Sequence, residues 1–402
     1  MQYDIVIGGA GIVGLATAYQ LLKQHPSLKL AILEKEPQIA AHQTGHNSGV
    51  IHSGIYYKPG SLKAENCLHG YRMLLEFCRQ EEVPHEKCGK VIVATREEEL
   101  SQLEMLCQRG QTNGLEGLEM MDQRDLQKRE PHCAGIAGLK VPQTGIVDYK
   151  EVSRKLADNI SRLGGEILCQ HPVTHIQQGV PVSVQSESRF LTAKVFVNCA
   201  GLYSDRLARM THPDLDLKIV PFRGEYYKLK PSRQHLVKHL IYPVPDPNFP
   251  FLGVHFTRMI QGGVEAGPNA VLAFRREGYH RTQFNARELL ETLQWPGFQK
   301  VALKYWRTGL GEMYRSFSKK AFTRALQRLV PEVQQEDLVA IPAGVRAQAC
   351  DRNGGLLDDF MILESEGIVN VCNAPSPAAT SSLSIGTTLK DMALKQLETA
   401  TT

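Results

Sequence analysis

Apolar residues follow two different patterns along this chain. In the N-terminal part, short and largely apolar runs, such as 3–7 and 28–33, flank a stretch with helical periodicity. A third run, at 195–197, leads toward a glycine. Runs of this kind are typical of strands buried on both faces of a parallel sheet. From about 221 to 276, polar and apolar residues alternate between Pro and Gly residues, which predicts an antiparallel sheet.

These patterns predict an α/β protein, α+β overall, with two domains. At 402 residues, the chain exceeds the size at which a single hydrophobic core keeps growing. We expect a Rossmann-like cofactor-binding domain with a parallel sheet, formed by the discontinuous segments 1–84, 146–218 and 337–402. We expect a substrate-binding domain with a mixed, largely antiparallel sheet, formed by 85–145 and 219–336.

The turn after the first apolar run has the pattern Gly-x-Gly-x-x-Gly, at Gly9, Gly11 and Gly14. Such glycines allow a tight turn, close approach of the backbone to a pyrophosphate, and close packing of the helix on the sheet. The N-terminus of the following helix favours a phosphate group. Glu34 follows the second run, about 20 residues beyond the last glycine, where a carboxylate binds ribose hydroxyls. The unit therefore predicts a bound adenine dinucleotide, and the acidic residue disfavours a 2′-phosphate.

Composition excludes several classes of function. Hydrophobic residues make up 42% of the chain and charged residues 22%, as in ordinary globular proteins. The net charge of +4 is small for this length and does not favour nucleic-acid binding. The nine cysteines form no CxxC pair and no metal-ligand spacing, so we expect reduced thiols and no metal site. We also expect no membrane span, which needs about 18 apolar residues, and no leader peptide before the first strand.

Three later segments carry small residues that suit contact with a long cofactor. They are a polar, glycine-rich loop at 44–54, the end of the third apolar run at 198–201, and a stretch of small residues at 373–380. Exposed backbone N–H groups in such segments can approach a ligand closely. A simple NAD domain has a plain second helix instead of this loop, so the three segments favour FAD.

Longer runs make the chain resemble a known family. The GxGxxG unit, the strand that ends in NCAG, the antiparallel segment and a C-terminal GxR segment resemble the D-amino-acid-oxidase-like FAD oxidoreductases. Within that group, several runs closely resemble the L-2-hydroxyglutarate dehydrogenase (oxidase) family. They are HQTGHNSGVIHSGIYY, PFRGEYY, HLIYPVPDP, GVHFTRM, GPNAVLAFRREGY, PAGVRAQ and CNAPSPAATSS. The resemblance covers essentially the whole chain. It implies FAD and the oxidation of L-2-hydroxyglutarate to 2-oxoglutarate by hydride transfer to flavin N5, with electrons passed to a quinone or another acceptor.

The same resemblance extends the set of expected cofactor contacts. It places the loop at 44–49 near the pyrophosphate and flavin, a strand backbone at Val173 against the adenine, and the loop at 376–381 near the flavin N1–C2=O edge. With the dinucleotide unit, the expected cofactor-binding residues are Gly9, Gly11, Gly14, Glu34, Lys35, Thr44, Asn47, Ser48, Gly49, Val173, Ala200, Gly201, Pro375, Ser376, Ala378 and Thr380.

Oxidation of a 2-hydroxy acid needs a base for the hydroxyl proton and cations for the carboxylates. His52, at the end of the glycine-rich loop, is the first candidate for the base, and His255 is the reserve. Alternatively, His52 only hydrogen-bonds the flavin or the backbone. Arg346 lies in an apolar segment that resembles the Gly-x-Arg stretch of related amine oxidases, so we expect it to bind one carboxylate.

The second carboxylate has weaker candidates. Arg223 and Arg258 offer guanidinium groups, but each is as well explained by a structural salt bridge. Tyr242, which precedes Pro243, either lines the substrate pocket or belongs to the core.

Basic residues at 320, 324 and 328 share one stripe of a helix predicted at 314–330. Such a helix either rests on anionic lipid or forms an ordinary solvated surface. We expect a cytoplasmic protein, to which the resemblance adds a peripheral position on the cytoplasmic face of the inner membrane.

Two other functions are compatible with the same residues. One is FAD-dependent oxidation of another small acid, such as an amino acid or glycerol 3-phosphate, on the same scaffold. The other is an FAD-bound scaffold or nucleic-acid adaptor without catalysis, which the small net charge disfavours.

Overall fold

The computed structural model describes residues 2–246 and 252–400, so Pro247 of the HLIYPVPDP run and the outermost residues of the chain lie outside the described residues. An eight-stranded sheet has the order β10-β11-β12-β1-β2-β9, with β20 beside β12 and β19 beside β20. Strands β20, β12, β1, β2 and β9 are parallel to one another. The bounds are β1 Gln2–Gly8, β2 Leu30–Leu33, β9 Glu166–Leu168, β10 Val173–Gln177, β11 Val182–Ser186, β12 Phe190–Asn198, β19 Met361–Ser365 and β20 Ile368–Asn373.

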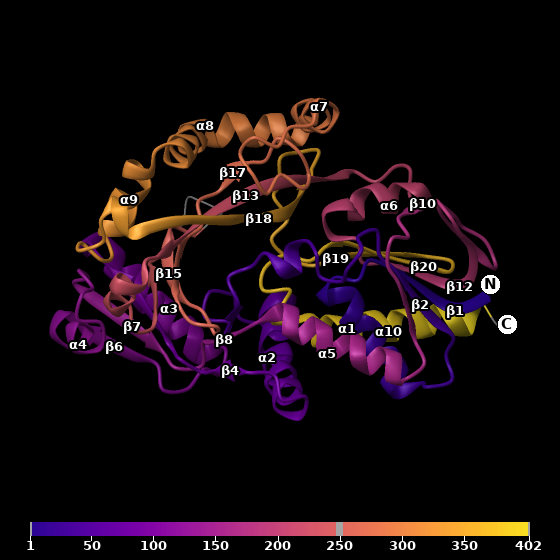
Figure 1. The fold of residues 1–402 in the computed structure, drawn as a ribbon, viewed down its shortest axis with the longest axis horizontal. Helices are drawn as coiled ribbons and strands as arrows, with labels where there is room; N and C mark the ends of the chain where they lie inside the picture. Colours follow the sequence, from indigo (N-terminus) through magenta and orange to yellow (C-terminus); the bar gives the residue numbers. More distant parts are fainter. Residues whose placement is uncertain (1, 247–251, 401–402) are drawn as a thin grey trace.

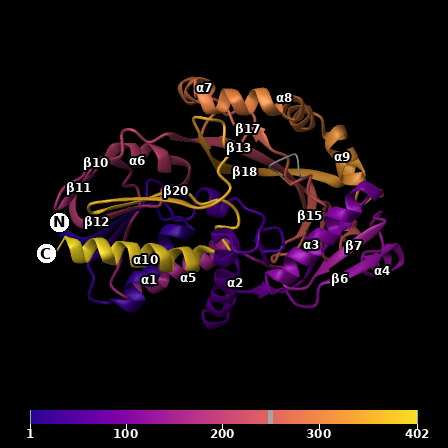
Figure 2. The same ribbon diagram turned by 180° about the vertical axis from the view of Figure 1, so that it is seen from behind.

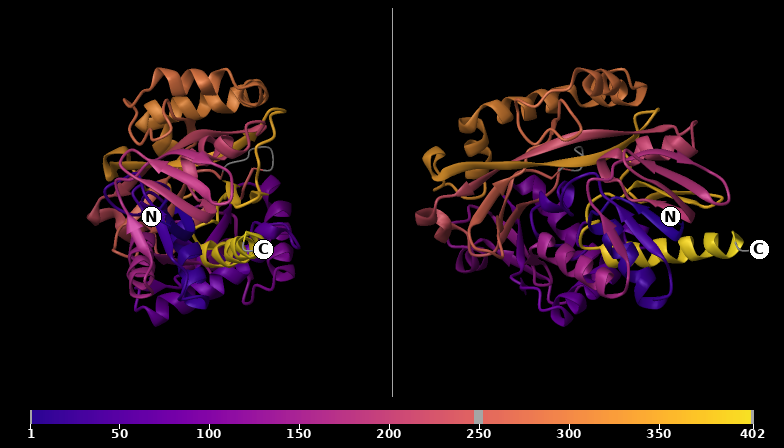
Figure 3. Two further views of the ribbon diagram at one scale, coloured as in Figure 1. Left: turned by 90° about the vertical axis from the view of Figure 1, so that its right-hand side faces the viewer. Right: turned by 45° about the vertical axis from the view of Figure 1, so that its right-hand side comes forward.

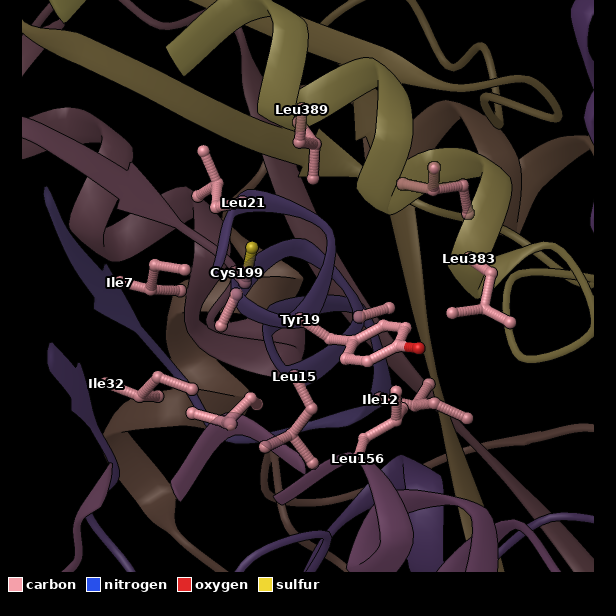
Figure 4. Close-up of a cluster of buried hydrophobic side chains, with 14 of the residues drawn as sticks. Ile7, Ile12, Leu15, Tyr19, Leu21, Ile32, Leu156, Cys199, Leu383 and Leu389 are labelled. Carbon is pink, nitrogen blue, oxygen red and sulfur yellow. The ribbon is translucent and has the colours of Figure 1, made fainter. Parts of the chain in front are cut away.

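Both faces of this sheet are buried. Helices α1 (Ile12–Gln24), α5 (Tyr149–Arg162) and α10 (Ser382–Thr399) lie side by side along one face (Figure 1). Ile7 of β1 packs there with Leu15 and Leu389 (Figure 4), while the neighbouring Val6 belongs to a separate buried cluster with Leu207 of α6 (Ser204–Thr211). Burying such side chains contributes about 1.5–3 kcal/mol each. The strands must therefore be apolar at successive positions, as the sequence pattern indicates.

A nine-stranded sheet forms the second half of the molecule, in the order β17-β13-β16-β15-β14-β5-β7-β6, with β18 beside β13. Apart from the parallel pair β14–β5, its neighbouring strands are antiparallel. The bounds are β5 Lys90–Ala94, β6 Glu119–Asp122, β7 Ala137–Val141, β13 Leu217–Leu229, β14 Leu240–Pro243, β15 His255–Arg258, β16 Val264–Gly267, β17 Val271–Leu272 and β18 Leu338–Asp351.

Helices cover this second sheet from two sides. Helices α7 (Ala286–Leu293), α8 (Pro296–Phe317) and α9 (Lys319–Gln327) form an outer layer over β13 and β18 (Figures 1 and 2). Helices α3 (Leu100–Thr112) and α4 (Gln123–Arg129) pack against the β5–β7 end. A three-stranded sheet of β3 (Val50–Ile51), β8 (Gly145–Val147) and β4 (His85–Glu86) lies near α2 (Leu62–Gln80).

The first sheet takes its strands from residues 2–33, 166–198 and 361–373, and the second from residues 90–141 and 217–351. Strand β18 pairs along its length with β13 in the second sheet, although it lies in the segment 337–402 that we expected in the cofactor-binding domain. Strand β1 near the start of the chain and helix α10 near its end belong to the same half of the molecule (Figure 3). In the described part of the chain, no helix has the length and apolar character that crossing a bilayer requires.

The helix predicted at 314–330 is two helices. Helix α8 ends at Phe317, and Ser318 caps α9 by accepting a hydrogen bond from the Ala321 N–H at 3.2 Å. A serine hydroxyl that satisfies a backbone donor is a typical helix start. Phe322 and Leu326 of α9 are buried. The prediction of one continuous amphipathic helix was therefore wrong, because the chain breaks at Ser318.

Candidate active site

One long cavity of about 800 Å³ connects the two sheets, within the range of ligand-binding cavities. One end is lined by Gly9, Glu34 and Val173, and the other by His52 and Arg346. Of the residues expected from the sequence, the cavity wall includes Gly9, Gly11, Glu34, Lys35, Thr44, Asn47, Ser48, Val173, Ala200, Gly201, Ser376, Ala378, Thr380, His52, Tyr242, His255, Arg223 and Arg346. Gly14, Gly49, Pro375 and Arg258 are not part of the wall.

The dinucleotide end is shaped by the absence of side chains. Gly9 has a φ of 108°, and a Cβ there would lie 2.6 Å from the Cys199 carbonyl oxygen. A Cβ on Gly14 would lie 2.1 Å from the Gly9 carbonyl oxygen. Gly14 therefore does not line the cavity itself, but it lets α1 pack close to the turn that does. The N-terminus of α1 faces the cavity through Gly11, and this arrangement fits a pyrophosphate.

Glu34 and Thr44 hold the backbone of this end in place. The Ala10 N–H donates to Glu34 Oε2 at 2.8 Å, and the Ile12 N–H donates to Thr44 Oγ1 at 3.0 Å. Both side chains are nine-tenths or more buried yet reach the cavity wall. A carboxylate oxygen accepts more than one hydrogen bond, so Glu34 can still accept from a ribose. The residues present thus fit an adenine dinucleotide.

A cluster of charges lies beside the same end, and we call it the Lys35 cluster: Lys35, Glu36, His42, Glu277 and Tyr279. The Lys35 Nζ lies 2.5 Å from Glu277 and 3.0 Å from His42 Nε2, and it also pairs with Glu36. His42 Nδ1 lies 3.0 Å from the Tyr279 hydroxyl. Burial opposes the charge of Lys35, but the carboxylates outweigh it and raise the lysine pKa. Glu36, His42 and Glu277 have the ligand types for a metal, but the ammonium occupies the position between them.

Two histidines stand at the other end of the cavity. The His52 N–H donates to Thr380 Oγ1 at 3.1 Å, and Thr380 also lies 2.9 Å from the Tyr149 hydroxyl. This contact joins the glycine-rich loop to the segment before α10. Burial, reinforced by nearby Lys90 and Arg346, lowers the pKa of His52 to about 3. Both histidine rings are therefore neutral at pH 7, since burial also lowers the pKa of His255 to about 4.

Arg346 faces the cavity from β18. Its side chain is open to the cavity, while protein surrounds the group on the other sides and burial lowers its pKa. Tyr57 and Tyr226 also line the cavity there and favour its charge. Lys63 is a further cation on the same wall, and burial lowers its pKa, an effect that nearby Asp358 opposes and Arg346 reinforces. Arg346 can therefore meet a carboxylate away from bulk water.

Tyr242 and His255 form one unit of the wall. Their rings are 3.9 Å apart between centroids and tilted by 32°. His255 Nδ1 lies 2.8 Å from the Gly253 carbonyl oxygen, which orients the ring. Tyr242 is 2% exposed and lines the cavity, so it belongs to both the pocket and the core.

The two weaker arginine candidates are engaged elsewhere. Arg258 is a partly exposed residue at the end of β15, where it pairs with Glu86 at 2.6 Å. This position corrects the expectation that it contacts substrate. Arg223 is buried and pairs with Glu225 at 3.1 Å. Glu225 also accepts a hydrogen bond from Ser316 of α8 at 2.7 Å, so Arg223, although it lines the cavity, is linked through Glu225 to the outer helix layer.

Sequence reasoning missed several residues of the catalytic end. They are Tyr56, Tyr57, Lys63 and Tyr226 on the wall, and Lys90 next to it. The tyrosines lie in runs that marked the family resemblance, but nothing in a single sequence separates them from core tyrosines. Lys90 had a signal, since it is the one charged residue in the apolar stretch KVIVA, and a lysine buried in a strand is unusual.

The whole chain is similar to known flavoproteins. The family model described as FAD dependent oxidoreductase matches residues 4–392. The L-2-hydroxyglutarate dehydrogenase of Indibacter alkaliphilus is 58% identical over 98% of this chain and 100% of its own length. The protein of the same name from Escherichia coli is 46% identical over 96% and 92%. The FAD-bound L-alpha-glycerophosphate oxidase of Mycoplasma pneumoniae superposes with a TM-score of 0.80 at 25% identity, over 99% of this chain and 95% of that one.

Proposed function

The chain belongs to the family of FAD-dependent oxidoreductases and, within it, to the L-2-hydroxyglutarate dehydrogenases, and from this premise we propose that it oxidises L-2-hydroxyglutarate to 2-oxoglutarate. The observation that carries the proposal is the single cavity, which joins a dinucleotide-shaped end at Glu34 to a cationic end at Arg346 with a neutral histidine, His52, on its wall. This order of groups suits an anionic hydroxy acid placed beside a cofactor.

The residues of the first sheet hold the cofactor in this proposal. Gly9, Gly11 and the N-terminus of α1 receive the pyrophosphate, and Glu34 binds the adenosine ribose. The segment at 374–380 lines the cavity just before α10, so the positive end of that helix dipole is directed toward the ring system. When bound, FAD supplies the acceptor for the two electrons that leave the substrate.

The residues of the second end act on the substrate. Arg346 binds the carboxylate next to the reacting carbon, in the bidentate manner that a guanidinium favours. His52 accepts the hydroxyl proton, because its neutral ring has a free acceptor nitrogen. Burial is the main cause of its low pKa, and the nearby charges of Lys90 and Arg346 lower the pKa further. A bound dicarboxylate offsets those cations and raises the pKa toward the value that a base needs.

Anaerobic titration of the purified protein tests this function. Bleaching of the flavin absorbance by L-2-hydroxyglutarate, with one equivalent of 2-oxoglutarate formed, is the expected result. The likeness to the glycerophosphate oxidase makes glycerol 3-phosphate the second substrate to test, and amino acids are the third. A flavin that stays oxidised with L-2-hydroxyglutarate but bleaches with one of these would refute the proposal.

We also propose that the protein meets an anionic membrane surface through α8 and passes its electrons to a quinone there. Helix α8 is kinked at Tyr305. Beyond the kink it exposes an apolar stripe of Trp306, Leu310, Tyr314 and Phe317, each between 53% and 66% exposed. Residues at this spacing share one face of a helix. Exposed Lys300, Lys304 and Arg307 flank the stripe. Apolar side chains beside cations fit the interface of a membrane that contains anionic lipid.

Vesicle sedimentation tests this contact. We expect binding to vesicles with phosphatidylglycerol, weaker binding to pure phosphatidylcholine, and release at high salt. Leu310→Glu should abolish binding, whereas Phe190→Glu, at an exposed aromatic position of β12 on the other sheet, should not. A different result would be an unchanged protein that fails to bind vesicles but forms a dimer, measured by light scattering, that Leu310→Glu disrupts. That result would assign this face to contact with a second copy of the chain.

A further inference from the structure

A dicarboxylate substrate needs a second anchor, and the arginines expected from the sequence do not provide it. Arg258 is paired at the surface, and Arg223 is paired with Glu225. The inference below rests on the proposed function, because it concerns the carboxylate far from the reacting carbon.

Lys90 is a buried cation beside the cavity. It begins β5 and is 1% exposed. Its Nζ lies 4.3 Å from the ring centre of Tyr56 and 5.0 Å from that of Tyr242, and both tyrosines line the cavity. Among the residues that the structure describes, the ammonium has these ring faces as partners and no carboxylate. A buried charge without a counter-charge is costly, so this position favours an anion that arrives from outside.

Tyr56 offers the hydrogen-bond donor that such an anion needs. Its hydroxyl is buried and has no partner among the described residues, although the residue lines the cavity. Buried polar groups are normally paired. Burial raises the pKa of Tyr56 well above its ordinary value, so the hydroxyl keeps its proton and can donate it to a carboxylate.

We propose that Tyr56 and Lys90 form the subsite for the second carboxylate of the substrate, with the Tyr56 hydroxyl as the hydrogen-bond donor and the Lys90 ammonium as the counter-charge. The place of His52 supports this assignment. Lys90 and Arg346 both act on its ring as nearby positive charges. A base with two cations near it matches a substrate that carries two carboxylates.

The groups that face Lys90 leave the counter-charge to the substrate. They are Tyr56, Tyr242, Cys67, His52 and His255. Burial keeps the tyrosines and Cys67 protonated, with the pKa of Cys67 raised to about 12, and keeps both histidines neutral. Burial also lowers the pKa of Lys90 to about 7. The subsite is therefore charged below neutral pH and loses its charge as the pH rises.

Two substrates that differ only at the far end test the subsite. L-2-hydroxyvalerate has the same five-carbon chain as L-2-hydroxyglutarate but a methyl group in place of the second carboxylate. In Lys90→Met and Tyr56→Phe, we expect kcat/KM for the dicarboxylate to fall about 10- to 100-fold, mainly through KM. Neither variant should lose activity on the hydroxyvalerate, which has no second carboxylate for the subsite to bind. Lys140→Met, at a paired lysine on the adjacent strand β7, should alter neither.

The pH dependence gives a second measurement. For the unchanged protein, kcat/KM for the dicarboxylate should fall as the pH rises through about 7, and this limb should be absent with hydroxyvalerate and in Lys90→Met. The subsite is refuted if kcat/KM falls equally for both substrates, that is, if the ratio of kcat/KM for the two substrates is unchanged in both variants. If the unchanged protein fails to oxidise L-2-hydroxyglutarate at all, the proposed function fails first and the subsite with it.

Discussion

Arg346→Gln removes the charge that, in the proposed function, holds the carboxylate beside the reacting carbon. Truncating one partner of a buried charge pair costs about 2–5 kcal/mol. Lys63 stays on the same wall and keeps part of the positive potential, so we expect about 2–4 kcal/mol, or a roughly 30- to 900-fold lower kcat/KM. The change should fall mainly on KM, because the guanidinium contacts a group that does not react.

The assay is dye-coupled oxidation of L-2-hydroxyglutarate, with the FAD content and melting temperature measured on the same preparations. Arg258→Gln is the matched control, because its ion pair with Glu86 is partly exposed and such pairs contribute about 0–1 kcal/mol. A kcat/KM for Arg346→Gln within about threefold of the unchanged protein, at full FAD content, contradicts a carboxylate contact. Equal losses of kcat/KM in both variants would show that Arg346 is no more important for substrate binding than Arg258.

Three further changes probe other parts of the fold. Gly14→Ala puts a Cβ 2.1 Å from a backbone oxygen, so the purified protein should contain little FAD, while Gly309→Ala, with open space around it in α8, should keep its FAD; equal FAD contents would contradict the close packing. Glu277→Gln weakens the Lys35 cluster beside the dinucleotide end, and should speed FAD loss on dilution without changing kcat at saturating FAD; unchanged FAD loss would contradict a role in retention. Buried His52 and His255 have lowered pKa values of about 3 and 4, so the free energy of unfolding should drop as the pH falls from 6.5 toward 4. The drop should be smaller in His255→Gln, by about 2 kcal/mol at pH 5. Equal drops in the free energy of unfolding for both proteins, measured by denaturant titrations at pH 7 and 5, would contradict it.

Much of the fold followed from local patterns. The apolar runs, the glycine turn and the acid at Glu34 together predicted the βαβ unit, and the expected fold class and FAD are confirmed by the family match and by the FAD-bound neighbour. Asp148 accepts a hydrogen bond from the Lys150 N–H at 2.8 Å at the start of α5, a typical helix N-cap. These features depend on neighbours in the sequence, and for that reason a single sequence reveals them.

The choice among arginines depends on contacts distant in the sequence. Arg223 and Arg346 lie on adjacent antiparallel strands, one residue out of register, since Arg346 is paired with Phe222. Both residues line the cavity, but Arg223 also pairs with Glu225. A bulge in β13 after Gly224 changes the pairing further along. Without the pairing of strands 120 residues apart, sequence alone gives no way to separate the two.

The electrostatics of the catalytic end link substrate choice to catalysis. In the free protein, burial lowers the pKa of His52 most, and the nearby cations Lys90, Arg346 and Lys63 lower it further. A base with a pKa of about 3 accepts a proton poorly near neutral pH. A dicarboxylate brings one negative charge toward Arg346 and another toward Lys90, whereas a monocarboxylate offsets Arg346 alone. The pKa of His52 therefore rises more when a dicarboxylate is bound than when a monocarboxylate is bound. In this way the proposed substrate itself raises the pKa of the proposed base toward the value that proton transfer needs.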